Sequence, residues 1–281
     1  MKTNITKPVV DTVIPMPLDY WPFKHSSLPK GEIWNFYGSD GEPLFEHNTQ
    51  ELPKDWIYHN TPVTYNFNSL GLRMKKEVEE VTGDYVYFGG SSFTLGCGLN
   101  EEDRFSEHVS TALGLDFINF SGPCYGIKLQ TINFFNFLQT GKHLRKILVV
   151  EHFQDAYNFY SQDNYLLYKS KFKASSEQWP HHFAAHAELM KTDFLIQEST
   201  MYVNILKSAC ERLGIKFLEM SFYNDDPVVL ANNIPSVDRL KNKDDLSYCF
   251  SRDVFNTGNE YTGHGGIGVN KDMTELLLKL I

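Results

Sequence analysis

The sequence predicts an α/β fold of three layers, in which helices cover both faces of a mainly parallel sheet. After residue 84, short apolar runs alternate with helical patterns. These runs are almost continuously apolar, which is typical of strands buried on both faces. The 281 residues, of which 42% are hydrophobic, suffice for one large domain or for one domain with an extension.

The first eighty residues differ from the remainder. From Pro15 to Pro62 the chain is rich in proline, asparagine, aromatic residues and turn dipeptides. Short strands are expected at 33–37 and 64–73, the second ending in a turn, with a tight turn at 39–42. We therefore expect residues 1–80 to form an irregular, β-containing N-terminal extension that packs on the core and covers a sheet edge. Residues 81–281 then form the α/β domain.

Within that domain the elements follow in a regular order. Strands are expected at 85–88, 117–120, 147–151 and 216–220. Helices are expected at 104–113, 129–138, 202–213 and 276–281, the last of which packs on the sheet. Because each strand is followed by a helical pattern, the strands are expected to run parallel.

An insertion at about 156–192 interrupts this order. It is dense in aromatic residues, which either wall a pocket or pack on the extension. It also contains His181, His182 and His186. Since Phe183 stands where a zinc-binding helix of metalloproteases has its glutamate, we expect surface histidines and no metal site.

Charge and composition indicate which partners and which cellular compartment the protein is expected to have. The net charge of −9 disfavours a nucleic-acid partner, whose phosphates would be repelled. No apolar run is long enough for a membrane span, and the first residues lack the apolar core of a signal peptide, so we expect a cytoplasmic protein. Four widely spaced cysteines indicate reduced thiols. No cofactor is expected, and the oligomeric state is left open.

The turn after the strand at 85–88 is the main candidate for chemistry. Gly89 and Gly90 allow a tight reversal, and Ser91 and Ser92 follow it. A serine at a strand end, beside free backbone N–H groups, has the layout of a nucleophile next to oxyanion donors, as acyl transfer needs. The alternative is a Gly/Ser loop without chemistry.

Four segments, in order along the chain, resemble the sequence blocks of the SGNH/GDSL hydrolase superfamily. Residues 90–98, Gly-Ser-Ser-Phe-Thr-Leu-Gly-Cys-Gly, resemble its Gly-Asp-Ser-Phe-Thr block with spaced glycines. The resemblance makes Ser92 the nucleophile and places Ser91 at the usual aspartate. Residues 119–126 resemble the second block, in which Cys124 occupies the slot of a glycine whose N–H helps to build the oxyanion hole.

The third and fourth blocks are matched by residues 152–155 and 263–268. In the third, Gln154 stands at the usual oxyanion asparagine, and its amide can donate the same hydrogen bond. The fourth implies that His264 is the general base. Including a short Asn-Ser-x-Gly-x-Arg segment before the fold, the resemblance extends from about residue 64 to the end and implies an SGNH-hydrolase or flavodoxin-like fold.

The motif comparison does not directly assign the acid that would orient His264, because Tyr261 occupies the family's aspartate position. A neutral phenol cannot supply the negative charge. Ser251-Arg252-Asp253 looks like the Ala-Arg-Asp that precedes the histidine in some members, with 254–263 as an insertion that loops out. Asp253 is therefore the first candidate, and Glu260 is the second.

The activity implied by the resemblance is hydrolysis of carboxylic esters through an acyl-enzyme on serine. The ester would carry a short acyl group, such as acetyl, possibly on a carbohydrate, or belong to a lipid. The side chains expected to contact the substrate are Ser91, Tyr125, His152 and Tyr261. The substituted block residues leave two alternatives open: a non-catalytic binding or structural protein of the same fold, and an acyltransferase that uses the same site.

Overall fold

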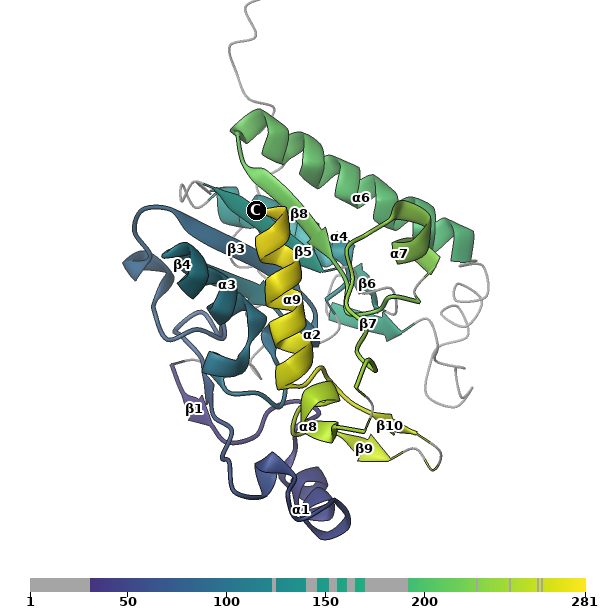
Figure 1. The fold of residues 1–281 in the computed structure, drawn as a ribbon. Helices are drawn as coiled ribbons and strands as arrows, with labels where there is room; N and C mark the ends of the chain where they lie inside the picture. The colour runs from purple at the N-terminus through teal and green to yellow at the C-terminus, as the bar shows by residue number, and fades with distance from the viewer. Residues whose placement is uncertain are drawn as a thin grey trace, which may run out of the picture.

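The computed structural model describes residues 31–281, apart from 123–124, 140–145, 152–155, 161–164, 170–191 and positions 226, 243, 257 and 259. In this part of the chain the central sheet has four parallel strands in the order β4-β3-β5-β8 (Figure 1). They are β3 (Tyr85–Gly90), β4 (Asp116–Ser121), β5 (Ile147–Glu151) and β8 (Lys216–Met220). The expected α/β fold with a parallel sheet is confirmed.

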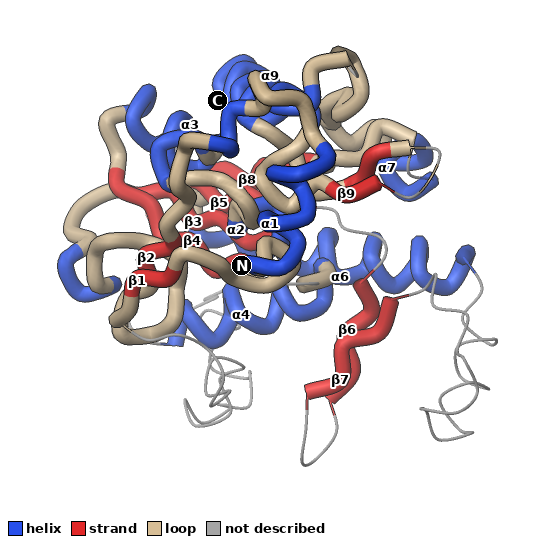
Figure 2. The backbone as a smooth tube through the Cα atoms, turned by 90° about the horizontal axis from the view of Figure 1, so that it is seen from below, coloured by secondary structure: helices blue, strands red, loops and turns tan. Residues whose placement is uncertain are grey.

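Helices cover both faces of this sheet (Figure 2). On one face lie α3 (Phe105–Leu113) and α9 (Ile267–Leu280), and on the other lie α4 (Ile127–Gln139) and α6 (Thr192–Leu213). The chain runs from β3 to the outer strand β4 and then returns to β5 on the other side of β3. The carboxyl ends of β3 and β5 therefore flank the crevice where ligands bind in such sheets.

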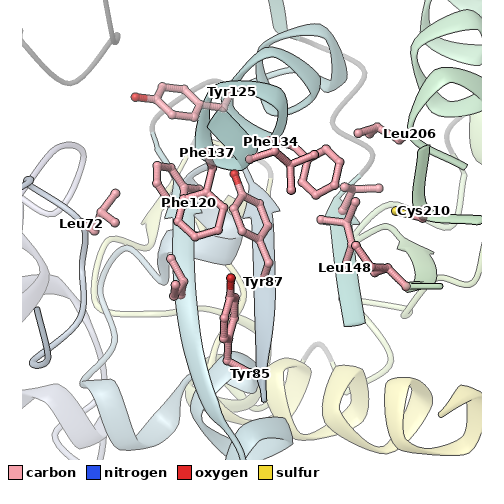
Figure 3. Close-up of a cluster of buried hydrophobic side chains, with 14 of the residues drawn as sticks. Leu72, Tyr85, Tyr87, Phe120, Tyr125, Phe134, Phe137, Leu148, Leu206 and Cys210 are labelled. Carbon is pink, nitrogen blue, oxygen red and sulfur yellow. The ribbon is translucent and has the colours of Figure 1, made fainter. Parts of the chain in front are cut away.

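Each face of the sheet carries its own hydrophobic core, and the side chains of β3 alternate between the two. Tyr87 faces α4 and α6, where its ring stacks on Phe120 at 5.1 Å and meets Phe134 edge to face at 5.8 Å (Figure 3). Its neighbour Phe88 points to the opposite face and packs on Phe105 of α3. Because both faces are buried, the strand is apolar throughout instead of alternating with polar residues.

Two helices are longer than the sequence indicates. Helix α9 begins at Ile267, not at 276, and α6 begins at Thr192, not at 202. In α9 the residues Val269, Met273 and Leu277 recur every four positions and are completely buried. The buried stripe of α9 thus begins before its apolar run, in a part of the helix that also contains polar residues. A prediction from the apolar run alone therefore misses the start of the helix. None of the described helices is long and apolar enough to cross a membrane.

The remaining elements are short. They include α2 (Ser92–Leu95), α7 (Pro227–Asn232), α8 (Leu246–Cys249) and the single-turn 3₁₀ helices η4 (Ile57–His59), η5 (Val78–Glu80) and η6 (Glu101–Asp103). Two antiparallel hairpins are formed by β6 (Ala156–Tyr160) with β7 (Tyr165–Lys169) and by β9 (Phe255–Asn256) with β10 (Tyr261–Thr262). The second hairpin coincides with the segment expected to loop out before His264.

The N-terminal segment has more regular structure than its composition suggests. Strand β1 (Ile33–Trp34) pairs with β2 (Tyr65–Asn66), and helix α1 (Glu42–Glu51) lies between them. The sequence pattern does not predict this helix, although Pro43 in its first turn is typical of a helix start. A cluster of apolar side chains joins the segment to the loop before α9; its members include Trp56, Tyr58, Tyr65, Phe67, Cys249, Phe250 and Val254.

Candidate functional site

The turn that carries Ser92 leaves the carboxyl end of β3. Strand β3 ends at Gly90, and a Cβ atom on this residue would lie 2.1 Å from Thr94 Oγ1, so the turn requires glycine. Ser91 then caps α2, because its Oγ accepts a hydrogen bond from the Phe93 N–H at 3.2 Å. Ser92 follows at the carboxyl edge of the sheet, just beyond the last paired residues of β3 and β5.

A buried carboxylate holds this turn in place. Glu151, the last residue of β5, accepts hydrogen bonds from the N–H and Oγ of Ser91 at 2.8 and 2.5 Å. It also accepts hydrogen bonds from the N–H and Oγ1 of Thr94 at 3.2 and 2.6 Å. Burial raises the pKa of Glu151, while the hydrogen bonds from Ser91 and Thr94 act in the opposite direction.

Ser91 and Tyr125 were both expected to contact the substrate, but their side chains lie inside the fold. Ser91 is completely buried, and its hydroxyl is engaged by Glu151. Tyr125 belongs to the core under α4, and its ring packs over Gly122. The motif blocks suggest substrate contacts for both, but both side chains are buried. Tyr261, on β10, is 39% exposed.

His264 lies just before α9 and is fixed by its backbone. Its carbonyl accepts a hydrogen bond from the Ser251 N–H at 2.9 Å, and the Gly266 N–H bonds the Cys249 carbonyl at 3.0 Å. The imidazole Nε2 lies 2.6 Å from Ser92 Oγ, within hydrogen-bond distance, although the two residues are 172 positions apart. The nucleophile and the general base that the motif resemblance implies therefore meet at this edge of the sheet.

The second ring nitrogen of His264 faces Asp253. The distance from Nδ1 to Asp253 Oδ2 is 2.5 Å, and the other oxygen, Oδ1, accepts hydrogen bonds from the His264 N–H at 3.0 Å and from Ser251 Oγ at 2.7 Å. A carboxylate only accepts hydrogen bonds, so Nδ1 carries the proton and Nε2 is left as the acceptor for the Ser92 hydroxyl. Glu260, the other candidate, lies exposed in the turn of the β9–β10 hairpin.

The environment of Asp253 favours its ionised form. Asp253 is 1% exposed, and burial alone would raise its pKa. The charge of His264 and the hydrogen bonds from His264 and Ser39 outweigh burial and hold the pKa of Asp253 well below its usual range. The negative charge needed to stabilise an imidazolium is therefore present at neutral pH.

The loop around Asp253 is held by a buried ion pair that the sequence motifs do not indicate. Arg252 donates from Nε and Nη2 to the two oxygens of Asp40, at 2.8 and 2.6 Å, and both side chains are almost completely buried. Tyr65 Oη donates to Asp40 Oδ2 at 2.5 Å and accepts a hydrogen bond from the Gly98 N–H at 2.7 Å. This network joins the N-terminal segment to the glycines that follow Ser92.

A cation stacks on the Phe93 ring, which packs on His264. The guanidinium of Arg239 stacks over the rings of Phe93 and Tyr223, at 5.0 and 4.6 Å from their centroids. Its Nη1 donates to the Gly263 carbonyl at 3.2 Å, which secures the residue before His264. Phe93 in turn packs on the imidazole, with the ring centroids 4.7 Å apart.

Three residues that the motifs propose for the site, Cys124, His152 and Gln154, lie outside the described residues. Within the described part of the chain, no cluster of three or more histidine, cysteine or acidic side chains could hold a metal ion. The sequence analysis did not predict the contribution of Glu151, although two features of the sequence point to it. Glu151 is a charged residue at the end of an apolar strand, and the block that follows β3 lacks its usual aspartate.

No protein-family model matches the sequence, and no curated protein sequence matches it. Among solved structures, the chain is similar to two lipolytic proteins of the G-D-S-L family. The one from Desulfitobacterium hafniense, described as putative, is 10% identical, with a TM-score of 0.41, and the match covers 71% of this chain and all of that one. The one from Veillonella parvula is 10% identical, with a TM-score of 0.39 and coverages of 71% and 98%.

A catalytic mutant of an acetylxylan esterase from Geobacillus stearothermophilus is also similar, at 12% identity, with a TM-score of 0.40 and coverages of 71% and 94%. Likenesses this remote bear on the fold at most. The case for a function therefore depends on the geometry around Ser92.

Proposed function

We propose that this chain is a serine hydrolase of carboxylic esters, with Ser92 as nucleophile, His264 as general base and Asp253 as the acid that orients the base. The observation that carries the proposal is the continuous chain of hydrogen bonds from Ser92 Oγ to His264 Nε2, at 2.6 Å, and from Nδ1 to Asp253 Oδ2, at 2.5 Å. Bases act on a nucleophile from about 3 Å, so these contacts suit proton transfer without rearrangement.

The reaction follows from the tautomer that Asp253 imposes. His264 Nε2 takes the Ser92 proton as Oγ attacks the ester carbonyl carbon, and a tetrahedral intermediate forms. When the ester C–O bond breaks, the imidazolium gives its proton to the leaving alcohol. Water, activated by the same nitrogen, then attacks the acyl-enzyme, and the carboxylic acid leaves as Ser92 regains its proton.

The oxyanion of the intermediate needs preorganised donors. The motif resemblance proposes three such donors, namely the N–H groups of Ser92 and Cys124 and the side-chain amide of Gln154. The substrate class that the same resemblance implies is an ester of a short acyl group, such as acetyl, possibly on a carbohydrate, or a lipid ester.

A serine-reactive fluorophosphonate probe and p-nitrophenyl acetate test the proposal. We expect the probe to label Ser92 and the ester to release acetate, and both reactions should disappear in Ser92→Ala and in His264→Ala. Ser69→Ala is the matched control, because Ser69 is an exposed serine that bonds Glu77 away from this site. A folded wild-type protein that is never labelled would reject the hydrolase and favour a binding protein. Transfer of acetyl to an added alcohol in place of water would identify an acyltransferase.

A further inference from the structure

The N-terminal segment reaches the hydrogen-bond chain through one residue, Ser39. Ser39 Oγ donates to Asp253 Oδ2 at 2.5 Å, although the two residues are 214 positions apart. This is the same carboxylate oxygen that faces His264 Nδ1. Ser39 Oγ is also 3.4 Å from Nδ1, within hydrogen-bond distance, so the hydroxyl and the imidazole meet at one carboxylate oxygen.

With this contact the carboxylate of Asp253 receives four hydrogen bonds. Oδ1 accepts from Ser251 Oγ and the His264 N–H, and Oδ2 accepts from His264 Nδ1 and Ser39 Oγ. A carboxylate has about four acceptor sites, so each is used. A carboxylate held at both oxygens cannot rotate away from the imidazole without losing hydrogen bonds, which matters because a buried charge left unbonded is costly.

The turn that presents Ser39 is rigid at both ends. Tyr37 and Asp40 exchange backbone hydrogen bonds at 3.1 and 3.2 Å across Gly38, whose φ of +65° lies in the left-handed region that glycine favours. The ring of Tyr37 packs on Phe67 at 5.0 Å, and Asp40 is held by its buried ion pair with Arg252. The hydroxyl is therefore delivered by a fixed turn and not by a free loop.

A second residue of the segment holds the backbone on either side of the acid. Asn48 of α1 is buried, and its Nδ2 donates to the carbonyls of Arg252 and Val254, at 3.3 and 2.6 Å. These are the two neighbours of Asp253 in the chain. The segment from Tyr37 to Asn48 thus contacts the acid through its side chain and through the backbone that flanks it.

We infer that Ser39 is a positioning residue for Asp253, and through it for His264, so that the N-terminal segment is part of the working site and does more than cover a sheet edge. This inference rests on the proposed function. Ser39 itself touches neither the reacting serine nor the substrate in the mechanism above. It acts by keeping Oδ2 of Asp253 aimed at Nδ1 of His264.

The test compares Ser39→Ala with Ser39→Thr, which keeps the hydroxyl, and with the control Ser69→Ala. Ser69 is also an exposed serine of the N-terminal segment that donates to a carboxylate, Glu77, at 2.6 Å. We expect Ser39→Ala to lower kcat for p-nitrophenyl acetate about tenfold, the effect of one hydrogen bond to a charged group, with KM unchanged. Ser39→Thr should recover most of the rate, and Ser69→Ala should match the wild type.

A double-mutant comparison separates positioning from a general structural effect. If Ser39 acts through Asp253, Ser39→Ala should change the rate of fluorophosphonate labelling no further in an Asp253→Ala background. A tenfold loss that persists in this background would overturn the inference, as would an unchanged kcat in Ser39→Ala alone. Absence of any turnover in the wild type would instead reject the proposed hydrolase.

A readout that needs no turnover covers that last case. The proton on His264 Nδ1 gives a far-downfield NMR resonance when it is shared with a carboxylate, and its position reports the geometry of that contact. We expect Ser39→Ala to shift or broaden this resonance and Ser69→Ala to leave it in place. An unchanged resonance in Ser39→Ala would overturn the positioning role whether or not the protein hydrolyses esters.

Discussion

The turn that carries Ser92 and the loop that carries Asp253 meet at His264, but they are held by different contacts. The Ser92 turn is fixed from within the sheet, by Glu151 at the end of the neighbouring strand. The Asp253 loop is fixed from the N-terminal segment, by Asp40 through the buried ion pair with Arg252. The nucleophile thus depends on the neighbouring strand of the parallel sheet and the acid on the N-terminal segment, so damage to the two should be separable.

The largest effect is expected for Asp253→Asn, which removes the charge and allows the wrong tautomer of His264. We expect turnover of p-nitrophenyl acetate to fall by up to about 10⁴, while the Ser92 turn keeps its structure because Glu151 holds it independently. Glu260→Gln, in the exposed hairpin turn, is the control and should retain the wild-type rate. If both variants turned over at the wild-type rate, no triad would operate, and His264 would act in a dyad with Ser92.

The next largest effect should come from Asp40→Asn, which leaves the buried guanidinium of Arg252 without its counter-charge. Removing one partner of a buried pair lowers the free energy of unfolding by about 3–5 kcal/mol. Asp116→Asn is the matched control, because Asp116 pairs with Lys76 at 2.5 Å with both side chains partly exposed. Such pairs contribute about 0–1 kcal/mol. Urea unfolding measures both, and equal losses would show that the Arg252 pair does not hold the loop.

On the serine side, Glu151→Gln should have a smaller effect on stability. The amide replaces one accepting oxygen by a donor, so part of the four hydrogen bonds from Ser91 and Thr94 is lost. An unsatisfied buried donor costs about 1–3 kcal/mol. Hydrogen exchange should accelerate at the Ser91 and Thr94 amides, whereas Glu211→Gln, on the exposed side of α6, should leave them protected. Unchanged protection of these amides in Glu151→Gln would contradict the contribution of Glu151 to the turn.

The smallest expected effect concerns pH: the contributions of Asp253 and Glu151 to the stability of the fold should change with pH in opposite directions. The folded pKa of Asp253 is depressed, so its contribution to stability is complete above the unfolded pKa of about 3.9 and is lost as the pH falls toward the folded value. The folded pKa of Glu151 is raised, so its ionised form destabilises the fold at higher pH, and acidification toward the unfolded value of about 4.3 relieves this.

Urea midpoints of the wild type and both variants against pH measure these two contributions. On acidification below about pH 4, the wild type should lose its advantage over Asp253→Asn. On acidification toward about pH 4 from neutral, it should gain stability relative to Glu151→Gln. The same sign for both differences would mean that the two carboxylates do not sit in opposite electrostatic environments.

The sequence alone determined the strands of the sheet and the first two members of the hydrogen-bond chain, Ser92 and His264. Strands β5 and β8 lie at the predicted residues, because a parallel strand buried on both faces leaves a continuous apolar run. Ser92 and His264 stood out because each belongs to a short contiguous motif with glycines, one after a strand and one before a helix. Patterns of this kind are local, so they can be recognised without knowing which segments meet.

The tertiary structure alone decided which groups surround that chain. Asp253 and Glu260 are both carboxylates of one segment, and only the fold shows that Asp253 meets Nδ1 of His264. The hydroxyl of Ser39 and the carboxylate of Glu151 come from segments far from the residues that they bind, and a serine in a turn or a glutamate at a strand end has no local pattern that names its partner. A hydrogen bond depends on a position in space within a few tenths of an ångström, and for residues so far apart in the chain only the packing of the whole molecule sets that position.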